Sequence, residues 1–255
     1  MFENEFKDKV VLVTGGSRGI GFATVKGFLA AGAKVYFLSH YEETGAKALA
    51  ALKEINPDYE VMTKAIDLCD FKAVQALYKE IEAKWGRLDV LVNNAGTDSS
   101  TWLTKLKQSE WDSVCDLNMK GPYTMIKYAI PYLVKTKGCV VNIASVAGVY
   151  GSPTGLPYPA SKAGLIAMTK SIAYSFANKG VRVNAVAPGV VATDLVANLP
   201  QFAKDSIGDT IPFKRFAQPE EIANGIMFLS SSAASYITGV CLQIDGGYRP
   251  NNQPA

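Results

Sequence analysis

The sequence is poor in histidine and in cysteine. Its 255 residues include one histidine, His40, and histidine is the usual side chain for proton transfer near neutral pH. The four cysteines form no C-x-x-C pair and no Cys/His cluster; they are Cys69, Cys115, Cys139 and Cys241. We therefore expect reduced thiols and no metal site, and any proton chemistry here needs an acid or base other than a cluster of histidines.

The chain also lacks a strong charge bias and a long apolar run. Its formal net charge is +3 and it has no basic run interleaved with aromatic residues, which disfavours nucleic acid as a partner. No apolar segment approaches the ~18 residues of a membrane span. The first stretch, MFENEFKDKVVLV, has no basic region followed by a long apolar one, as a secretory signal would. These absences predict a soluble, cytoplasmic protein.

What the chain contains instead is a regular alternation of apolar strand patterns and helix patterns. Strands that are apolar throughout are typical of a parallel sheet covered on both faces. The alternation, with no linker, predicts one domain, 1–255, with a doubly wound α/β (Rossmann) fold and a seven-stranded parallel sheet. The expected strands are 10–14, 35–38, 60–67, 89–94, 139–145, 181–188 and 240–245. The expected helices are 20–32, 41–55, 71–85, a long region around 109–136, 158–178 and 219–231.

One segment, 194–218, departs from this alternation. It has no clean period and is long for a connection, which predicts a lid over a substrate. The alternative is that its apolar residues only pack the loop against the body. The expected lining of the lid is Leu195, Val196, Leu199, Phe202 and Ile207.

A glycine-rich turn, TGGSRGIG at 14–21, lies between the first expected strand and the first expected helix. Such a turn lets the backbone approach a pyrophosphate, and the N-terminus of the helix supplies N–H groups. A plain glycine turn is the alternative, but the position in the first βα unit favours a dinucleotide site. The expected cofactor contacts in this turn are Gly15, Ser17, Arg18, Gly19, Ile20 and Gly21.

The second expected strand ends at Ser39 and His40, the place where the adenosine ribose binds in this fold. A carboxylate there favours NAD and repels the 2′-phosphate of NADP. Neither residue is acidic and Arg18 is close by, so we expect NADP(H) to be favoured. NAD(H) is the alternative because Glu42 and Glu43 follow closely, and His40 can instead be a solvated loop residue.

Two further strand ends contribute expected cofactor contacts. Asp67 and Leu68 follow the third strand and are placed to contact adenine. Asn94, Ala95 and Gly96 follow the fourth strand, beside the crevice where ligands of such sheets bind. Both groups can instead be simple turn chemistry.

The stretch YPASK, 158–162, places Tyr158 and Lys162 on one face of an expected helix. Ser145 ends the fifth expected strand, and the glycine- and proline-rich turn 148–157 can fold Tyr158 back towards it. Free tyrosine has a pKa of about 10, which a nearby ammonium and the positive ring of an oxidised nicotinamide would lower. Tyr158 would then exchange a proton with an alcohol oxygen that Ser145 positions. In isolation, a packed tyrosine and a solvated lysine is the better interpretation.

These motifs are not isolated, and their order carries a resemblance. TGGSRGIG at 14–21, NNAG at 93–96, Asn118, Ser145, YPASK at 158–162 and PGVVAT at 188–193 follow one another along the chain. The set resembles the short-chain dehydrogenase/reductase family over essentially the whole length. The resemblance implies an NAD(P)-dependent oxidoreductase, commonly a homotetramer.

The resemblance also implies roles for particular residues. Ser145, Tyr158 and Lys162 form the catalytic triad, Lys162 also holds the nicotinamide ribose, and Asn118 supports a water-mediated proton relay behind the lysine. Thr193 contacts the nicotinamide carboxamide. The same cofactor-binding segment includes Pro188, Gly189 and Val191.

A narrower resemblance concerns the substrate. The stretches 144–164, 186–194 and 245–250 are similar to the bile-acid 3α-hydroxysteroid dehydrogenases of gut anaerobes. They imply a bulky, flat, apolar alcohol or ketone from lipid metabolism, that is, a small-molecule apolar alcohol or ketone as partner, although His40 stands where the NAD-using members are expected to have an acidic residue.

Two other functions stay open. A 3-oxoacyl-[acyl-carrier-protein] reductase would favour basic residues near the site, for which the scattered candidates are Lys105, Lys107, Lys204, Lys214 and Arg215. A catalytically idle dinucleotide-binding sensor is the other possibility, against which the complete set of Asn118, Ser145, Tyr158 and Lys162 argues.

Overall fold

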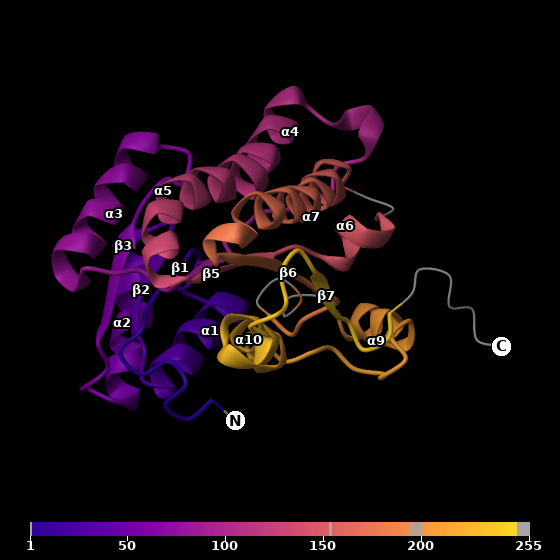
Figure 1. Cartoon of the computed structure of the whole chain (residues 1–255). Helices are drawn as coiled ribbons and strands as arrows, with labels where there is room; N and C mark the ends of the chain where they lie inside the picture. Colours follow the sequence, from indigo (N-terminus) through magenta and orange to yellow (C-terminus); the bar gives the residue numbers. More distant parts are fainter. Residues whose placement is uncertain (1, 153–154, 194–195, 197–199, 249–255) are drawn as a thin grey trace.

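The computed structural model describes residues 2–152, 155–193, 196 and 200–248 (Figure 1). Seven parallel strands form one sheet in the order β3-β2-β1-β4-β5-β6-β7. The strands are β1 (Val10–Val13), β2 (Lys34–Ser39), β3 (Val61–Ala65), β4 (Val90–Asn93), β5 (Cys139–Ile143), β6 (Arg182–Pro188) and β7 (Cys241–Ile244). The predicted doubly wound fold with a seven-stranded parallel sheet is confirmed.

Helices cover both faces of the sheet, as Figure 1 shows. The α-helices are α1 (Gly19–Ala30), α2 (Glu42–Ile55), α3 (Phe71–Trp85), α4 (Gln108–Cys115), α5 (Gly121–Thr136), α6 (Val146–Tyr150), α7 (Pro157–Phe176), α9 (Gln201–Asp209) and α10 (Pro219–Ser230). Short 3₁₀ turns lie at η1 (Leu103–Lys105), η3 (Ala177–Lys179) and η4 (Ser232–Ala234), and η2 (Asp116–Lys120) is a π-helical turn.

Two buried clusters, one on each face, explain why the strands are apolar throughout. Val11 and Val13 of β1 face one cluster, to which α1, α2 and α10 contribute. Val10 and Leu12 of the same strand face the other, with α3, α5 and α7. Because successive side chains of a strand point to opposite faces, a sheet covered on both sides needs apolar residues at every position.

Three segments differ from their expected form. The long helical region expected around 109–136 is divided into α4, the π-helical turn η2 and α5, and π-turns of this kind are frequent at functional sites. The expected turn 148–157 overlaps the short helix α6, and the expected irregular segment 194–218 contains the helix α9. The glycines and prolines of 148–157 favoured a turn over the helix α6. The helix α9 is short and mostly exposed, so its sequence shows little apolar periodicity.

The expected lid residues are only partly within the described ranges. Leu195 and Leu199 lie outside them. Phe202 on α9 is 76% exposed, whereas Val196 and Ile207 are partly buried. An exposed phenylalanine is compatible with the lid interpretation, which stays a prediction.

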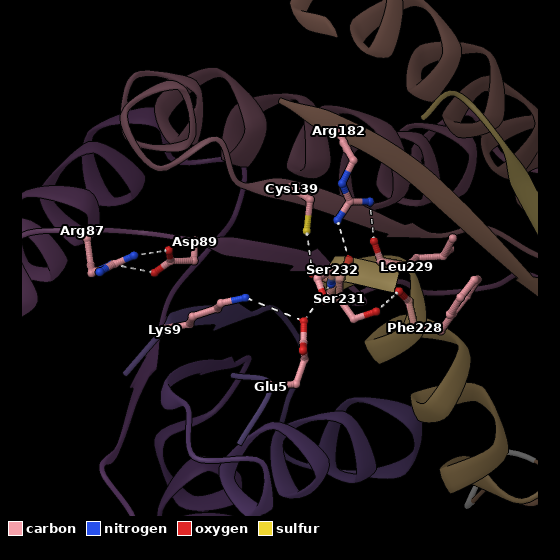
Figure 2. A network of polar contacts seen from close by, with 11 residues as sticks. Glu5, Lys9, Arg87, Asp89, Cys139, Arg182, Phe228, Leu229, Ser231 and Ser232 are labelled. Carbon is pink, nitrogen blue, oxygen red and sulfur yellow. Dashed lines mark hydrogen bonds and ion pairs between the residues drawn. The ribbon is translucent and has the colours of Figure 1, made fainter. Parts of the chain in front are cut away.

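The amino edge of the sheet is closed by a network of polar contacts, shown in Figure 2. The Asp89 carboxylate accepts hydrogen bonds from the Val10 N–H at 2.9 Å and from Arg87 Nε and Nη2 at 2.9 and 2.6 Å. Arg182, at the start of β6, donates from Nη1 to the Leu229 carbonyl at the end of α10 at 2.6 Å. This edge therefore satisfies its polar groups from within the chain.

Two negative findings apply to the described ranges alone. None of their helices has the length and apolar character that crossing a bilayer requires. No group of three or more His, Cys, Asp or Glu side chains in the same ranges is arranged to hold a metal ion.

Candidate active site

The glycine turn folds tightly between β1 and α1. Gly15 and Gly19 have φ angles of +65° and +53°, which side chains with a Cβ rarely adopt. The Gly16 N–H donates to the Leu38 carbonyl at 2.9 Å, which brings the turn against the end of β2. A Cβ on Gly21 would collide with the Gly15 carbonyl oxygen, so α1 can begin directly beneath the turn only with glycine there.

Asn94 ties the end of β4 to this turn. Its Nδ2 donates to the carbonyl oxygens of Thr14 and Gly15 at 3.0 and 2.9 Å. The Thr14 Oγ1 accepts from the N–H groups of Asn94 and Ala95 at 3.0 and 2.9 Å. β1 and β4 are the neighbours at which the strand order reverses, the place where doubly wound sheets bind ligands.

These residues fit a nicotinamide dinucleotide. The turn offers backbone groups with no side chain in the way, and the N-terminus of α1 favours negative charge. Thr193 reaches the same turn, because a Cβ on Gly19 would lie 3.2 Å from its Cγ2. Arg18 is exposed at the N-cap of α1, and Ser17 and Ile20 are partly exposed beside it. When bound, the dinucleotide supplies the hydride chemistry.

A cavity of about 480 Å³ borders the turn. Its lining includes Gly19, Phe22, Thr193, Phe216 and Pro219. The cavity therefore adjoins the expected pyrophosphate position, whereas the residues of the expected triad lie outside its lining.

The expected ribose contacts differ from each other in their setting. Ser39 is buried, its Oγ donates to the Tyr41 carbonyl at 2.9 Å, and Gly45 packs against it. His40 is exposed, and its ring and that of Tyr41 pack edge to face with 4.3 Å between their centroids. Of the two side chains, only that of His40 projects into solvent, so contact from Ser39 would come from its backbone.

The other strand ends show both turn chemistry and packing. Asp67 Oδ1 accepts from the Cys69 N–H at 2.8 Å, and Leu68 is buried against Gly121. Their side chains thus stabilise the turn, so any contact of Asp67 or Leu68 with a cofactor would come from the backbone at the end of β3. Pro188 pairs with Ile244, Gly189 lies against Asp245, and the buried Val191 bridges to Ala217. That pairing positions the segment that ends at Thr193.

Lys162 is buried, although it carries an ammonium. Only 4% of the residue is exposed, and its Nζ donates to the Ile143 carbonyl at the end of β5 at 2.8 Å. Burial lowers the pKa of Lys162 to about 8. Its Nζ lies 5.7 Å from the centroid of the Tyr158 ring, so the expected pair is brought together.

The pKa of Tyr158 is raised, which differs from the expected lowering. Burial is the largest cause, the negative charge of Asp98 adds to it, and a hydrogen bond with the Ser145 side chain acts in the opposite direction. Lys162 is not among the causes of this shift, although its Nζ lies 5.7 Å from the centroid of the Tyr158 ring. In the protein without cofactor, the pKa of Tyr158 is therefore not lowered, whereas the sequence predicted a lowering by the lysine together with a positive cofactor.

Ser145 and Asn118 complete the expected catalytic group. Ser145 caps α6, where its Oγ accepts from the Ala147 N–H at 3.1 Å. Asn118, in η2, donates from Nδ2 to Ser161 Oγ at 3.0 Å. A Cβ on Gly96 would lie 3.1 Å from Asn118 Oδ1 and 3.2 Å from Lys162 Nζ. The structure thus brings Asn118, Lys162 and the end of β4 to one point.

Sequence reasoning missed a polar path that holds α7 on the sheet. Asn93 Nδ2 donates to Asn142 Oδ1 at 2.8 Å, and Asn142 Nδ2 donates to Thr169 Oγ1 at 2.9 Å. All three residues are buried. Thr169 lies seven residues beyond Lys162 on the same helix, so the path helps to fix the register of Tyr158 and Lys162. An asparagine inside an apolar strand was the available signal.

The arrangement can perform proton exchange at an oxygen beside Tyr158. The phenol is the donor or acceptor, Ser145 bonds to it and can position the same oxygen, and Lys162 holds a cation beneath the ring. Asp98 and Ser161 are further members of this environment that sequence reasoning did not identify.

Comparison with known proteins identifies similar proteins over nearly the whole chain. The family model described as enoyl-(acyl carrier protein) reductase matches residues 15–249. A 3alpha-hydroxysteroid dehydrogenase of Mediterraneibacter gnavus is 41% identical over 244 residues, which cover 95% of this chain and 98% of the relative. A 3-oxoacyl-[acyl-carrier-protein] reductase of Thermotoga maritima is 39% identical over 240 residues, 94% of this chain and 97% of the relative.

A 3-oxoacyl-[acyl-carrier-protein] reductase of Synechocystis is 42% identical over 241 residues, 94% of this chain and 96% of the relative. The relatives are NAD(P)-dependent oxidoreductases, so the predicted enzyme class is confirmed and the idle sensor is set aside. The chain therefore belongs to the short-chain dehydrogenase/reductase family.

Proposed function

We propose that the protein is an NADP(H)-preferring oxidoreductase that interconverts a secondary alcohol and a ketone on a hydroxysteroid such as a bile acid. The observation that carries the proposal is a set of exposed apolar side chains in two segments whose backbones meet at Gly155, three residues before Tyr158. Leu156, two residues before Tyr158, is 43% exposed, and Trp102 and Leu103 are 63% and 66% exposed. The loop preceding Trp102 touches the turn at Gly155. Such a surface suits a bulky apolar substrate.

The cofactor preference rests on charge around the end of β2. Arg18, at the N-cap of α1, and His40, directly after β2, are both exposed, and an arginine guanidinium is a positively charged partner that suits phosphate. The nearby Glu43 is engaged by Lys47, whose Nζ lies 2.7 Å from its Oε1. The exposed cation favours a 2′-phosphate more than a 2′-hydroxyl.

A substrate panel tests the proposal. We expect kcat/KM for a hydroxysteroid to exceed that for an acetoacetyl thioester by at least about tenfold, and NADP(H) to be preferred over NAD(H). Trp102→Ala should lower kcat/KM for the steroid by about tenfold and change that for the thioester little. A thioester preference, or equal losses on both substrates, contradicts the steroid assignment.

A 3-oxoacyl-[acyl-carrier-protein] reductase is the second candidate, favoured by the exposed Lys105 and Lys107 and by the relatives that carry this name. Other expected basic residues are engaged: Arg215 donates to both Glu221 oxygens at 2.7 and 2.8 Å, and Lys214 donates to the Asp209 carbonyl at 2.7 Å. A Lys105→Glu, Lys107→Glu variant separates the two. If the second candidate is correct, this variant should slow the reduction of a carrier-bound substrate. If the steroid assignment is correct, the rate with the hydroxysteroid should stay unchanged.

Assembly as a homotetramer, expected from the resemblance to the family, and a cytoplasmic location, expected from what the sequence lacks, belong to the same proposal. Light scattering after size-exclusion chromatography measures the mass of the assembly. A monomer would contradict this part of the proposal and leave the enzymatic part intact.

A further inference from the structure

Asp98 lies in the loop that leaves β4, and the residue before it is fixed to the floor of the site. The Thr97 N–H donates to Asn118 Oδ1 at 2.9 Å, and the Thr97 carbonyl accepts from Asn118 Nδ2 at 2.8 Å. Asn118 is fully buried. With both backbone groups of Thr97 bound to one buried side chain, the loop cannot swing away freely at this point.

The residue after Asp98 is fixed as well. The Ser99 hydroxyl donates to the Glu110 carboxylate of α4, and the Ser99 carbonyl lies so close to Gly155 that a Cβ there would collide with it. The Gly155 carbonyl in turn accepts from the Tyr158 N–H at 2.9 Å. Asp98 is therefore held between Asn118 and the turn that begins the helix of Tyr158.

The carboxylate of Asp98 is not neutralised by a neighbour. The residue is exposed, and it takes part in none of the ion pairs that join described residues. Lys162 and Asp98 are the charged groups of the described residues that the contacts and charges place near Tyr158, and only the charge of Asp98 shifts the pKa of the phenol. Lys162 lies beneath the ring and bonds to the Ile143 carbonyl, and Asp98 acts on the phenol through its negative charge. Glu110, next to Ser99, is a second carboxylate, and hydrogen bonds from Ser99 and Thr101 together with the charge of Lys107 lower its pKa, so the cation that faces it is Lys107.

We propose that Asp98 is a specificity-determining residue whose carboxylate makes the entrance beside Tyr158 negative and disfavours substrates with an anionic group next to the reacting carbon. Like charges a few ångströms apart repel, and exposure and salt limit the effect to a several-fold change. The preferred substrate is neutral around its reacting carbon, with any acidic group far from it. The inference rests on the proposed function, because it narrows the substrate class of the same site.

The test compares two small ketones that differ in charge: acetoacetate, whose carboxylate lies close to the keto carbon, and its neutral ethyl ester. We expect Asp98→Asn to raise the ratio of kcat/KM for acetoacetate to that for the ester about fivefold, and Asp98→Glu to leave it near the wild-type value. Asp58→Asn is the matched control, because it removes the same charge from an exposed position and should change nothing. An unchanged ratio in Asp98→Asn, or an equal loss on both ketones, overturns the proposal.

A second measurement needs no turnover. The ionisation of Tyr158 is followed by tyrosinate absorbance as the difference between the enzyme and its Tyr158→Phe variant, with and without Asp98→Asn. Removing the negative charge should move this titration to lower pH, because the phenolate is then less disfavoured. A titration that stays in place overturns the proposal. If neither ketone nor any hydroxysteroid is reduced with either cofactor, the proposed function fails, and the titration alone decides the role of Asp98.

Discussion

The two edges of the sheet satisfy their polar groups in different ways. At the amino edge, Asp89, Arg87 and Arg182 bind backbone and side-chain groups of the same chain (Figure 2). At the carboxyl edge, glycines keep the turn after β1 open and a buried ammonium, Lys162, bonds to a single carbonyl. The first edge is arranged for stability. The second keeps groups such as the buried Lys162 ammonium in energetically unfavourable environments, as active sites commonly do, where they can interact with a bound reactant.

The strongest way to break this comparison is to remove the phenol hydroxyl at the carboxyl edge. Tyr158→Phe should lower kcat by about 10³-fold or more, because a positioned acid/base group contributes on the order of 10²–10⁴-fold. Cofactor binding and thermal stability should stay near wild type, since the ring and its packing are kept. Turnover measurements and cofactor titration check both parts, and a variant with substantial activity would remove Tyr158 from the proton-exchange role.

Lys162 sharpens the comparison through the pH dependence of stability. Burial lowers the pKa of Lys162 to about 8 in the folded protein, against an ordinary value of 10.5 for a solvated lysine. Between these two values the unfolded chain binds more protons than the folded one, so raising the pH through this window stabilises the folded state. The gain is on the order of 3 kcal/mol, from 1.36 kcal/mol per pKa unit.

The measurement is chemical denaturation of wild type and Lys162→Met between about pH 7.5 and 10.5. The free energy of unfolding of the wild type should rise relative to that of the variant across this range. Tyrosines and cysteines that titrate here are present in both proteins, and their contributions largely cancel. Parallel pH profiles for the two proteins would show that burial does not destabilise the ammonium.

Asp89 tests the amino edge. Asp89→Asn breaks the ion pair with Arg87 and weakens the bond from the Val10 N–H, so it should lower the free energy of unfolding by about 2 kcal/mol. Activity at a temperature where the variant is folded should be unchanged. Asp58→Asn serves as the control and should cost less than about 0.5 kcal/mol. A large drop in kcat in folded Asp89→Asn would mean that the two edges are coupled.

The smallest expected effects concern cofactor choice at the end of β2. Arg18→Ala should lower the preference for NADPH over NADH by about tenfold, and His40→Ala by a few-fold, because the guanidinium is always charged. The ratio of the two dissociation constants, measured by cofactor fluorescence, reports this directly. Ser39→Ala is the matched control: its hydroxyl is engaged with Tyr41, so the ratio should not move. An unchanged ratio in Arg18→Ala would contradict the NADP(H) proposal.

Much of this could be predicted from the amino-acid order, for reasons that are local or topological. Apolar runs such as 139–143 show a buried parallel strand, and glycines after the first strand show a turn that carries no side chains. Tyr158 and Lys162 share a helix face because of their spacing alone. Ser145 joins them because carboxyl ends of neighbouring parallel strands meet at one edge of the sheet.

Tertiary structure decided what depends on which distant segments cover a residue. The pKa values of Tyr158 and Lys162 follow from burial, which no spacing in the sequence reveals. Ser39 turned inward because Gly45 leaves space for it, whereas its neighbour His40 stayed exposed. Asp98 came to Tyr158 through Asn118, Ser99 and Gly155, contacts that join three separate loops and helices. Desolvation and charge act through space, so they are settled only when the chain has folded.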